Sequence, residues 1–260
     1  MFCDATGVTK AHVFAESWTG LFDKPNDTRE YEVVHRCIEP STGNQREIKR
    51  AKTFALKSRK VCGTCNSGWL SQLEERVRPL MATFAQNTPI ILDSDEQADL
   101  ALWALAASLL AMSTDPEACG FADPTLAREI NSAKRPTAGI DMWLGANAHG
   151  ELGWFDSHSL NLRNVRDAPE QGAWGATITF GYAVIHIVCH DAPNQRIRLK
   201  GDAHRSLRRI WGPRDRVVWP PKLVMRPQDR SHLASIVPEQ GSFERAVARS
   251  TPQPTRARCS

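Results

Sequence analysis

The 260-residue chain lacks the features that would place it in a membrane or in an oxidising compartment. Its longest apolar run, residues 100–112, is well short of the roughly 20 residues that a bilayer-spanning helix needs. Nothing at its start resembles a secretory signal, because Asp4 interrupts the apolar beginning. The seven cysteines are odd in number and unevenly spaced, which argues against a disulfide framework. We therefore expect a cytoplasmic protein with no membrane association.

The chain also lacks an internal repeat and a strong charge of one sign. A formal net charge of +4 is too small to identify a polyanionic partner, so the distribution of charge matters more than its sum. With 41% hydrophobic and 24% charged residues, the composition is that of an ordinary globular protein. Its length allows one sizeable core and a smaller module.

The first part of the chain has a pattern of strands followed by a helix. Strand-like residues at 31–38 and 47–56, with turn residues between them, predict a hairpin. Apolar residues then recur at helical spacing over residues 69–84, where Pro79 predicts a kink or a break. Asn66 is thus expected where the hairpin gives way to a helix.

The rest of the chain predicts more helix and then a sheet, which makes the fold class α+β. Ser94 and Gln97 form a plausible capping box for a second, buried helix. Short apolar or alternating runs between residues 140 and 189 predict a mainly antiparallel sheet, with helices covering one face. The chain beyond Pro238 is too polar to bury much. We therefore expect a module at 1–70, a helix-plus-sheet domain at 71–238 and a disordered tail at 239–260.

A close cysteine pair, Cys62 and Cys65, belongs to the most informative motif, CGTCNSGW at residues 62–69. Two thiolates on one tight turn supply two of the four ligands of a structural zinc ion. In a reducing compartment such a pair favours a metal over a disulfide. Cys3 is the cysteine near the N-terminus that is available as a further ligand.

The order of motifs resembles the HNH endonuclease family, in particular its bacterial and phage branch. That branch reads roughly CxFC, then TxEHV, then CxxCNxGW; this chain has Cys3, then TKAHV at residues 9–13, then CGTCNSGW. The resemblance extends weakly into three further patches, at residues 101–103, 210–213 and 219–221. It implies an N-terminal zinc-bound ββα-metal module.

The resemblance also implies a role for each motif residue. In the family, a histidine near the scissile phosphate acts as general base for a water, and a divalent ion stabilises the leaving oxygen. By resemblance, His12 is that base and Asn66 assists a catalytic Mg²⁺ or Mn²⁺. Structural Zn²⁺, held by Cys3, Cys62 and Cys65, would keep the small module rigid.

Three positions depart from the family pattern. The acidic metal ligand directly before the histidine is replaced by Ala11, which removes an oxygen ligand that a hard cation prefers. The middle Asn of the family name is replaced within residues 56–59. The cysteine that would pair with Cys3 falls immediately before Met1, so we expect the true start to lie upstream, with Met1 an internal methionine.

The remaining cysteines and histidines have simpler interpretations. If the chain does start at Met1, the fourth zinc ligand must come from elsewhere, and Cys37 or His35 could be recruited. The preferred interpretation is a small buried apolar side chain for each of Cys37, Cys119 and Cys189. His186 lies within an apolar strand and is expected to be a core histidine.

Basic residues gather just before the second cysteine motif, with only Glu47 against them: Arg46, Lys49, Arg50, Lys52, Lys57, Arg59 and Lys60. Beside a nuclease site they can track a phosphate backbone, and the alternative is a solvated hairpin face. Their position favours a nucleic-acid partner, DNA more than RNA. A second basic run at residues 196–216 fits a surface role and a binding role equally.

The expected function is metal-dependent hydrolysis of DNA phosphodiester bonds. The replacement at Ala11 keeps a second class open, a zinc-stabilised nucleic-acid-binding protein that has lost catalysis. A third class, a structural interaction protein, would require the basic residues to have no ligand. Resemblance of fold does not choose among the three.

Overall fold

The computed structural model describes residues 1–22, 32–38, 45–114, 124–137, 139–162, 171–190, 197–199, 203–212, 215–225, 233 and 236–238. The predicted disordered tail at 239–260 lies outside the described residues. The described elements form a mixed α+β protein whose strands pair mainly antiparallel, as the sequence predicts at this level. In the described part of the chain, no helix combines the length and apolar character needed to span a bilayer.

The largest sheet is built on two long strands, β6 (Ile140–Leu162) and β7 (Gln171–His190), which pair antiparallel. β2 (Glu32–Ile38) lies parallel to β6, and β3 (Gln45–Lys52) lies antiparallel to β2. On another part of β6, β9 (Leu207–Arg209) pairs antiparallel. The predicted hairpin is therefore present as β2 and β3, and it forms part of the large sheet.

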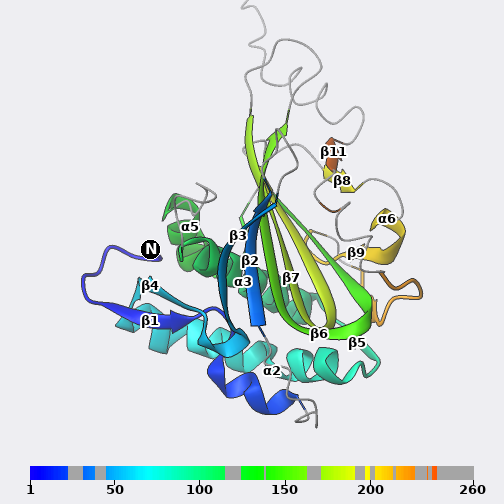
Figure 1. Ribbon diagram of the computed structural model, residues 1–260, viewed down its shortest axis with the longest axis horizontal. Coiled ribbons are helices and arrows are strands. Elements are labelled where there is room, and N and C mark those ends of the chain that lie inside the picture. The colour runs from blue at the N-terminus through cyan, green and yellow to red at the C-terminus, as the bar shows by residue number, and fades with distance from the viewer. Residues whose placement is uncertain are drawn as a thin grey trace, which may run out of the picture.

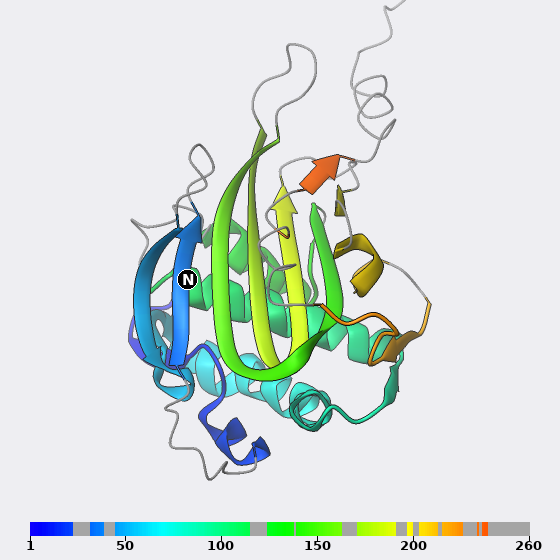
Figure 2. The same ribbon diagram turned by 45° about the vertical axis from the view of Figure 1, so that its right-hand side comes forward.

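β7 is bent back on itself within this sheet. Thr177 Oγ1 and His186 Nδ1 lie 2.9 Å apart although the two residues are nine positions apart in sequence. Nine extended residues would span roughly 30 Å, so the strand must reverse between them. Gly181, with a φ of +58°, lies at this reversal, and Figure 2 shows β6 curving in a wide U. The short separate runs predicted from the sequence are joined into two long bent strands.

The turn of β7 at Gly181 packs against the C-terminal end of α2 (Ser71–Gln86). A Cβ atom at Gly181 would lie 2.7 Å from both the Phe84 carbonyl oxygen and the Ala85 Cα atom. The positive φ adds to the requirement for glycine, because a side chain disfavours that backbone conformation. The sheet and the first long helix are therefore fitted together at this turn.

Helices α2 and α3 (Ser94–Met112) lie against one face of the large sheet, and α5 (Pro124–Ala133) packs beside α3 (Figure 1). Pro79 does not break the helix, because α2 continues through it. Its buried residues are those the helical spacing predicts, Leu73, Val77, Leu80, Met81 and Phe84. α3 is apolar all round and is buried along most of its length.

The capping box of α3 begins one residue earlier than predicted. The Asp93 carboxylate accepts hydrogen bonds from the backbone N–H groups of Asp95 and Glu96, and the Glu96 carboxylate accepts one from the Asp93 N–H. Gln97 instead donates its side-chain amide to the carbonyl oxygens of Leu92 and Asp215. The predicted Ser94–Gln97 pair was wrong because Asp93 already satisfies the first free N–H groups.

A second, two-stranded sheet leads into α2. β1 (Val8–His12) pairs antiparallel with β4 (Lys57–Cys62), which follows the short turn η2 (Thr53–Ala55). The chain then passes through α1 (Gly63–Cys65) and the wider turn η3 (Asn66–Leu70) into α2. The strand that precedes the helix thus pairs with β1. The prediction that the hairpin at 31–56 leads directly into the helix was wrong.

Short elements complete the described chain. A 3-10 turn, η1 (Glu16–Leu21), follows β1 and contacts α2. Two small antiparallel pairs involve the later strands: β5 (Ile90–Leu92) with β10 (Val217–Trp219), and β8 (Ile197–Leu199) with β11 (Ile236–Pro238). One helical turn, α6 (Ala203–Ser206), precedes β9.

One hydrophobic cluster extends from Phe2 to Trp219 and includes residues on both sides of the predicted boundary at residue 70. Trp18 and Trp219 are each 0% exposed, which places large aromatic side chains at its centre. Trp103 of α3 packs against Trp18, with ring centroids 5.3 Å apart. A smaller cluster lies around Trp143, Val184 and Val188 on β6 and β7.

Candidate metal centre and the adjoining basic face

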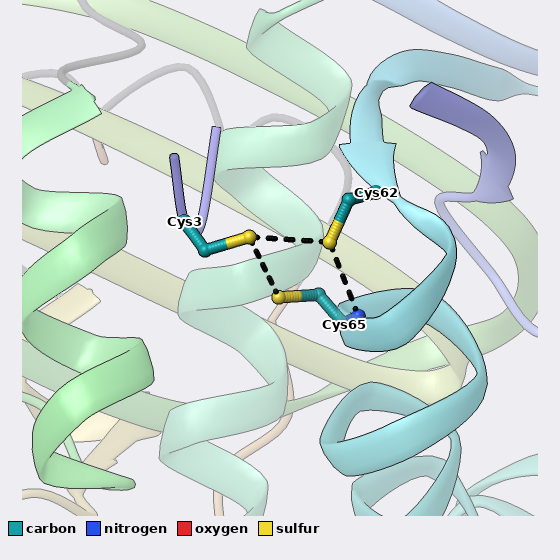
Figure 3. Close-up of side chains that lie close together, drawn as sticks. All are labelled: Cys3, Cys62 and Cys65. Atoms are coloured by element: carbon teal, nitrogen blue, oxygen red, sulfur yellow. Dashed lines mark hydrogen bonds between the residues drawn. The ribbon is translucent and has the colours of Figure 1, made fainter. Parts of the chain in front are cut away.

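Three cysteine sulfur atoms meet where the N-terminal arm reaches the end of β4 (Figure 3). Cys3 Sγ lies 3.1 Å from Cys62 Sγ and 3.5 Å from Cys65 Sγ. A disulfide would bring two of them to about 2.0 Å, and all three cysteines are free. Zn–S bonds of about 2.3 Å in a tetrahedron hold sulfurs roughly 3.8 Å apart, so the three sulfurs would have to move apart by a few tenths of an ångström to surround a zinc ion. The cluster is therefore able to hold a metal ion.

The turn that carries Cys62 and Cys65 is shaped for this role. Cys62 ends β4 with an extended backbone, and the chain enters the single turn of α1. The backbone N–H of Cys65 donates to Cys62 Sγ at 3.4 Å, and the Ser67 hydroxyl donates to the Gly63 carbonyl. Both sulfurs consequently point to the same side of the turn, toward Cys3 (Figure 3).

Cys62 and Cys65 differ in acidity. The pKa of Cys62 is lowered, mainly because its sulfur accepts the hydrogen bond from the Cys65 backbone. Burial raises the pKa of Cys65 to about 12, and its contacts with Cys3 and Cys62 act in the same direction. The Cys65 thiol therefore keeps its proton at neutral pH, and binding of a metal by its thiolate would release that proton.

The arm that carries Cys3 is fixed by residues on both sides of it. Phe2 packs edge-on against Trp69, with ring centroids 5.3 Å apart. Asp4 accepts a hydrogen bond at 2.8 Å from Arg128 of α5. Lys134, just after α5, lies 4.5 Å from the centre of the same Trp69 ring. Burial lowers the pKa of Lys134, and the nearby Cys65 acts in the opposite direction.

The structure does not test the predicted alternatives for a fourth ligand. Among the described residues, no further His, Cys, Asp or Glu side chain completes the group of three. Cys37 and His35 lie on β2 in the large sheet, and their side chains lie outside the described part, as does Cys119. Cys189 is 5% exposed and belongs to the hydrophobic core, as predicted.

His12 and Ala11 point to opposite sides of β1. Ala11 is 1% exposed and faces the core opposite Ser58. The His12 side chain is 21% exposed, and its Nε2 lies 3.2 Å from Glu16 Oε2 without the alignment of a hydrogen bond. Burial lowers the pKa of His12, Lys57 lowers it further, and Glu16 acts in the opposite direction.

The other predicted catalytic residue, Asn66, follows the cysteine turn. In the β1–β4 ladder, Val8 pairs with Cys62 and His12 pairs with Lys57. Four strand residues advance by about 13 Å, so His12 and the cysteine cluster lie at opposite ends of the ladder. Asn66 lies four residues beyond Cys62, and no hydrogen bond or ion pair joins it to His12 among the interactions of the described residues.

The predicted basic cluster is divided between two sheets. Lys57, Arg59 and Lys60 lie on β4, the last two exposed. Lys10 is exposed on β1, the neighbouring strand, and was not singled out from the sequence because only the β1–β4 register reveals it. The other members lie on β3, where the structure does not describe side chains: Arg46, Lys49, Arg50 and Lys52.

Buried polar residues on the large sheet form a second group. His186 is 0% exposed and is within hydrogen-bond distance of Thr177, as expected for a core histidine. His190 Nε2 lies 3.4 Å from Asp141, which also contacts Arg209 Nη1 at 2.7 Å. The sequence reveals no such network, since its members are far apart in the chain.

Comparison with known proteins adds no assignment. The chain matches no protein-family model, and comparisons with curated proteins and with solved structures find no match either.

Proposed function

We propose that this protein is a metal-dependent endonuclease whose N-terminal module is held together by zinc. The observation that carries the proposal is the position of His12, which projects from the outer side of the β1–β4 ladder beside exposed cations. The cysteine cluster at the other end of the ladder has the ligands that zinc prefers. The proposal assigns the elements β1, β4 and α2 to a ββα arrangement of the HNH type.

His12 has the properties required of a general base. Its lowered pKa keeps the imidazole neutral at pH 7, which is the form that accepts a proton from water. Its side chain is 21% exposed, so part of the imidazole faces solvent, whereas Nε2 itself is enclosed beside Glu16. A divalent cation bound at this site would supply positive charge to the leaving oxygen.

The basic residues on the same ladder would bind the phosphate backbone. Lys10, Arg59 and Lys60 are exposed, and Lys57 stands directly across from His12. Cations in this arrangement favour any polyanionic strand and carry no base specificity by themselves. DNA is the proposed substrate, with Asn66 proposed to assist the catalytic ion.

The structural ion would be Zn²⁺, held by Cys3, Cys62 and Cys65. Three sulfurs from two distant segments lie together without forming a disulfide. Binding of a metal ion would account for this arrangement. A bound ion would fix the N-terminal arm to the turn before α2. The zinc content of the purified protein, measured by mass spectrometry of the metal, tests this part directly.

Cleavage of plasmid DNA with Mg²⁺ or Mn²⁺ tests the proposed activity. The wild-type protein is expected to cut the plasmid, and His12→Ala is expected to lose about 100-fold or more of the rate. His149→Ala, which changes an exposed histidine on β6, is the matched control. Equal cutting by the wild-type protein and His12→Ala, or no cutting by either, would remove the hydrolytic proposal.

A second candidate function is favoured by Ala11. Its burial means that the residue expected to carry the family's metal-binding carboxylate faces the core instead of the solvent. The second candidate is therefore a zinc-stabilised protein that binds nucleic acid without cutting it. That candidate is supported if DNA binding weakens steeply with salt while no cleavage occurs with either ion.

A further inference from the structure

We propose that Glu16 supplies the carboxylate that Ala11 cannot, and that it binds the divalent cation beside His12. The proposal rests on the proposed nuclease function and adds a residue to its site. Glu16 does not occupy the position expected for an acidic ligand, because it lies five residues after Ala11 and on a different element.

Position 11 is closed to a metal ligand by the direction of its side chain. Ala11 is 1% exposed, and its neighbour across the ladder, Ser58, is also 1% exposed. A carboxylate at position 11 would therefore enter the core, where an unpaired charge is strongly disfavoured. Any acidic ligand for a cation beside His12 must come from another segment.

Glu16 is placed to be that ligand. Its Oε2 lies 3.2 Å from His12 Nε2, the only carboxylate within ion-pair distance of His12 among the described residues. His12 Nε2 is itself enclosed and makes no hydrogen bond, so the structure leaves a polar atom facing this carboxylate unsatisfied. The two groups thus converge on one point at the outer end of the ladder.

The backbone of Glu16 is fixed although its carboxylate is free to reach solvent. Glu16 begins η1, its carbonyl accepts a hydrogen bond from the Thr19 hydroxyl, and Trp18 of the same turn is fully buried. The Glu16 side chain is 71% exposed. A hard cation such as Mg²⁺ or Mn²⁺ retains several waters and is typically held by one or two carboxylates, so an exposed oxygen on a fixed turn suits it.

The positive charge of Lys57 repels a cation bound beside His12. Substitutions of Lys57 and Glu16 should therefore change the affinity for that cation in opposite directions. It pairs with His12 across the ladder, and its charge is close enough to lower the His12 pKa. An ammonium group so near a divalent ion weakens binding of that ion in the absence of a phosphate. Removing Lys57 should therefore strengthen binding of the free ion, whereas removing Glu16 should weaken it.

Mn²⁺ titration followed by NMR of the His12 ring tests the inference without relying on activity. Paramagnetic Mn²⁺ is expected to broaden the His12 signals of the wild-type protein. Glu16→Gln is expected to weaken this effect at least 10-fold, and Lys57→Met to strengthen it about 2- to 5-fold. Glu129→Gln, on the exposed side of α5, is the matched control and should behave as wild type.

The outcomes separate this inference from the proposed function. If Glu16→Gln binds Mn²⁺ as tightly as wild type, the role of Glu16 is overturned, whatever the activity. If the wild-type protein cuts DNA but Glu16→Gln cuts it equally well, the role of Glu16 fails and the nuclease stands. If the wild-type protein shows neither broadening nor cutting, both fail. Zinc content should be the same in every variant, which shows that the cysteine cluster is intact.

Discussion

Ala11 lies on β1 with its methyl group directed into the core. It is 1% exposed and belongs to the main hydrophobic cluster. A carboxylate there would have to leave water for the protein interior. The departure from the family pattern thus coincides with a buried position, and a charged residue is poorly suited to it.

Ala11→Asp is expected to lower the free energy of unfolding by about 2–4 kcal/mol, because the new carboxylate must be desolvated or protonated. Urea unfolding monitored by tryptophan fluorescence measures this change. Lys10→Asp, which alters the exposed neighbour, is the control and should change stability by less than about 1 kcal/mol. Equal effects from the two substitutions would show that position 11 does not face the core.

Glu74 links stability to pH at the start of α2. Burial raises its pKa to about 7, and Glu75 adds to the rise. Because the folded pKa lies above the unfolded value of 4.5, the folded state binds more protons between about pH 4.5 and 7. Stability should therefore fall as pH rises through this window and then level off above it.

Glu74→Gln removes the group that titrates. It is expected to stabilise the protein by about 2 kcal/mol at pH 8 and to have little effect at pH 4, when the native carboxyl is protonated. Thermal unfolding across this pH range measures the difference. Glu129→Gln serves as an exposed control. A stabilisation of the same size at both pH values would argue against titration of Glu74.

Side chains on and just after helix α5 contact the segments that surround the cysteine cluster. The Arg128–Asp4 ion pair joins this helix to the arm that carries Cys3. Lys134, just after the helix, contacts Trp69 of η3, which packs against Phe2 of that arm. Lys134 has a φ of 51°, a left-handed conformation for which glycine is ordinarily preferred after a helix. The lysine at this position places its ammonium group over the Trp69 ring, a contact that glycine could not make.

Lys134→Gly should therefore separate local stability from metal affinity. We expect the melting temperature to stay the same or rise, because glycine suits the backbone, while the zinc affinity falls about 10-fold through loss of the contact with Trp69. Competition with a chelator measures the affinity. Arg135→Ala changes the exposed adjacent residue and should alter neither quantity by much. A parallel loss of both would indicate a general disruption of the fold.

The sequence patterns predicted individual helices better than they predicted which strands pair with one another. The helical face from Leu73 to Phe84 and the buried helix containing Trp103 stand out because their periodicity is local. The pairing of β1 with β4 does not, since about fifty residues separate the strands and their β-propensity is modest. For the same reason Lys10 and Glu16 could not be assigned to a site, whereas the cysteine motif could.

For the whole molecule, the shared core argues for one cooperative unit. The cluster that contains Phe2 and Trp18 also contains Trp103 and Trp219, on both sides of the predicted boundary at residue 70. The parallel pairing of β2 with β6 adds a further connection across that boundary. Loss of the metal at one edge should therefore be felt throughout the core.

Calorimetry of the zinc-loaded protein is expected to show a single unfolding transition, and chelation of zinc should lower its midpoint by several degrees. Cys62→Ser should lower the midpoint similarly and make it insensitive to the chelator. Cys189→Ser, a buried cysteine outside the cluster, is the control that keeps the chelator response. Two separate transitions would instead support independent folding of residues 1–70.

The five-residue strand β1 joins two ends that differ in chemical softness. The end beside Cys62 has sulfur donors, whereas the end at His12 has an imidazole and a carboxylate oxygen nearby. Sulfur selects thiophilic ions and oxygen selects hard ones. A thiophilic competitor such as Cd²⁺ would accordingly replace an ion held by the sulfurs and spare an ion held beside His12, so that the two proposed ions can be exchanged separately.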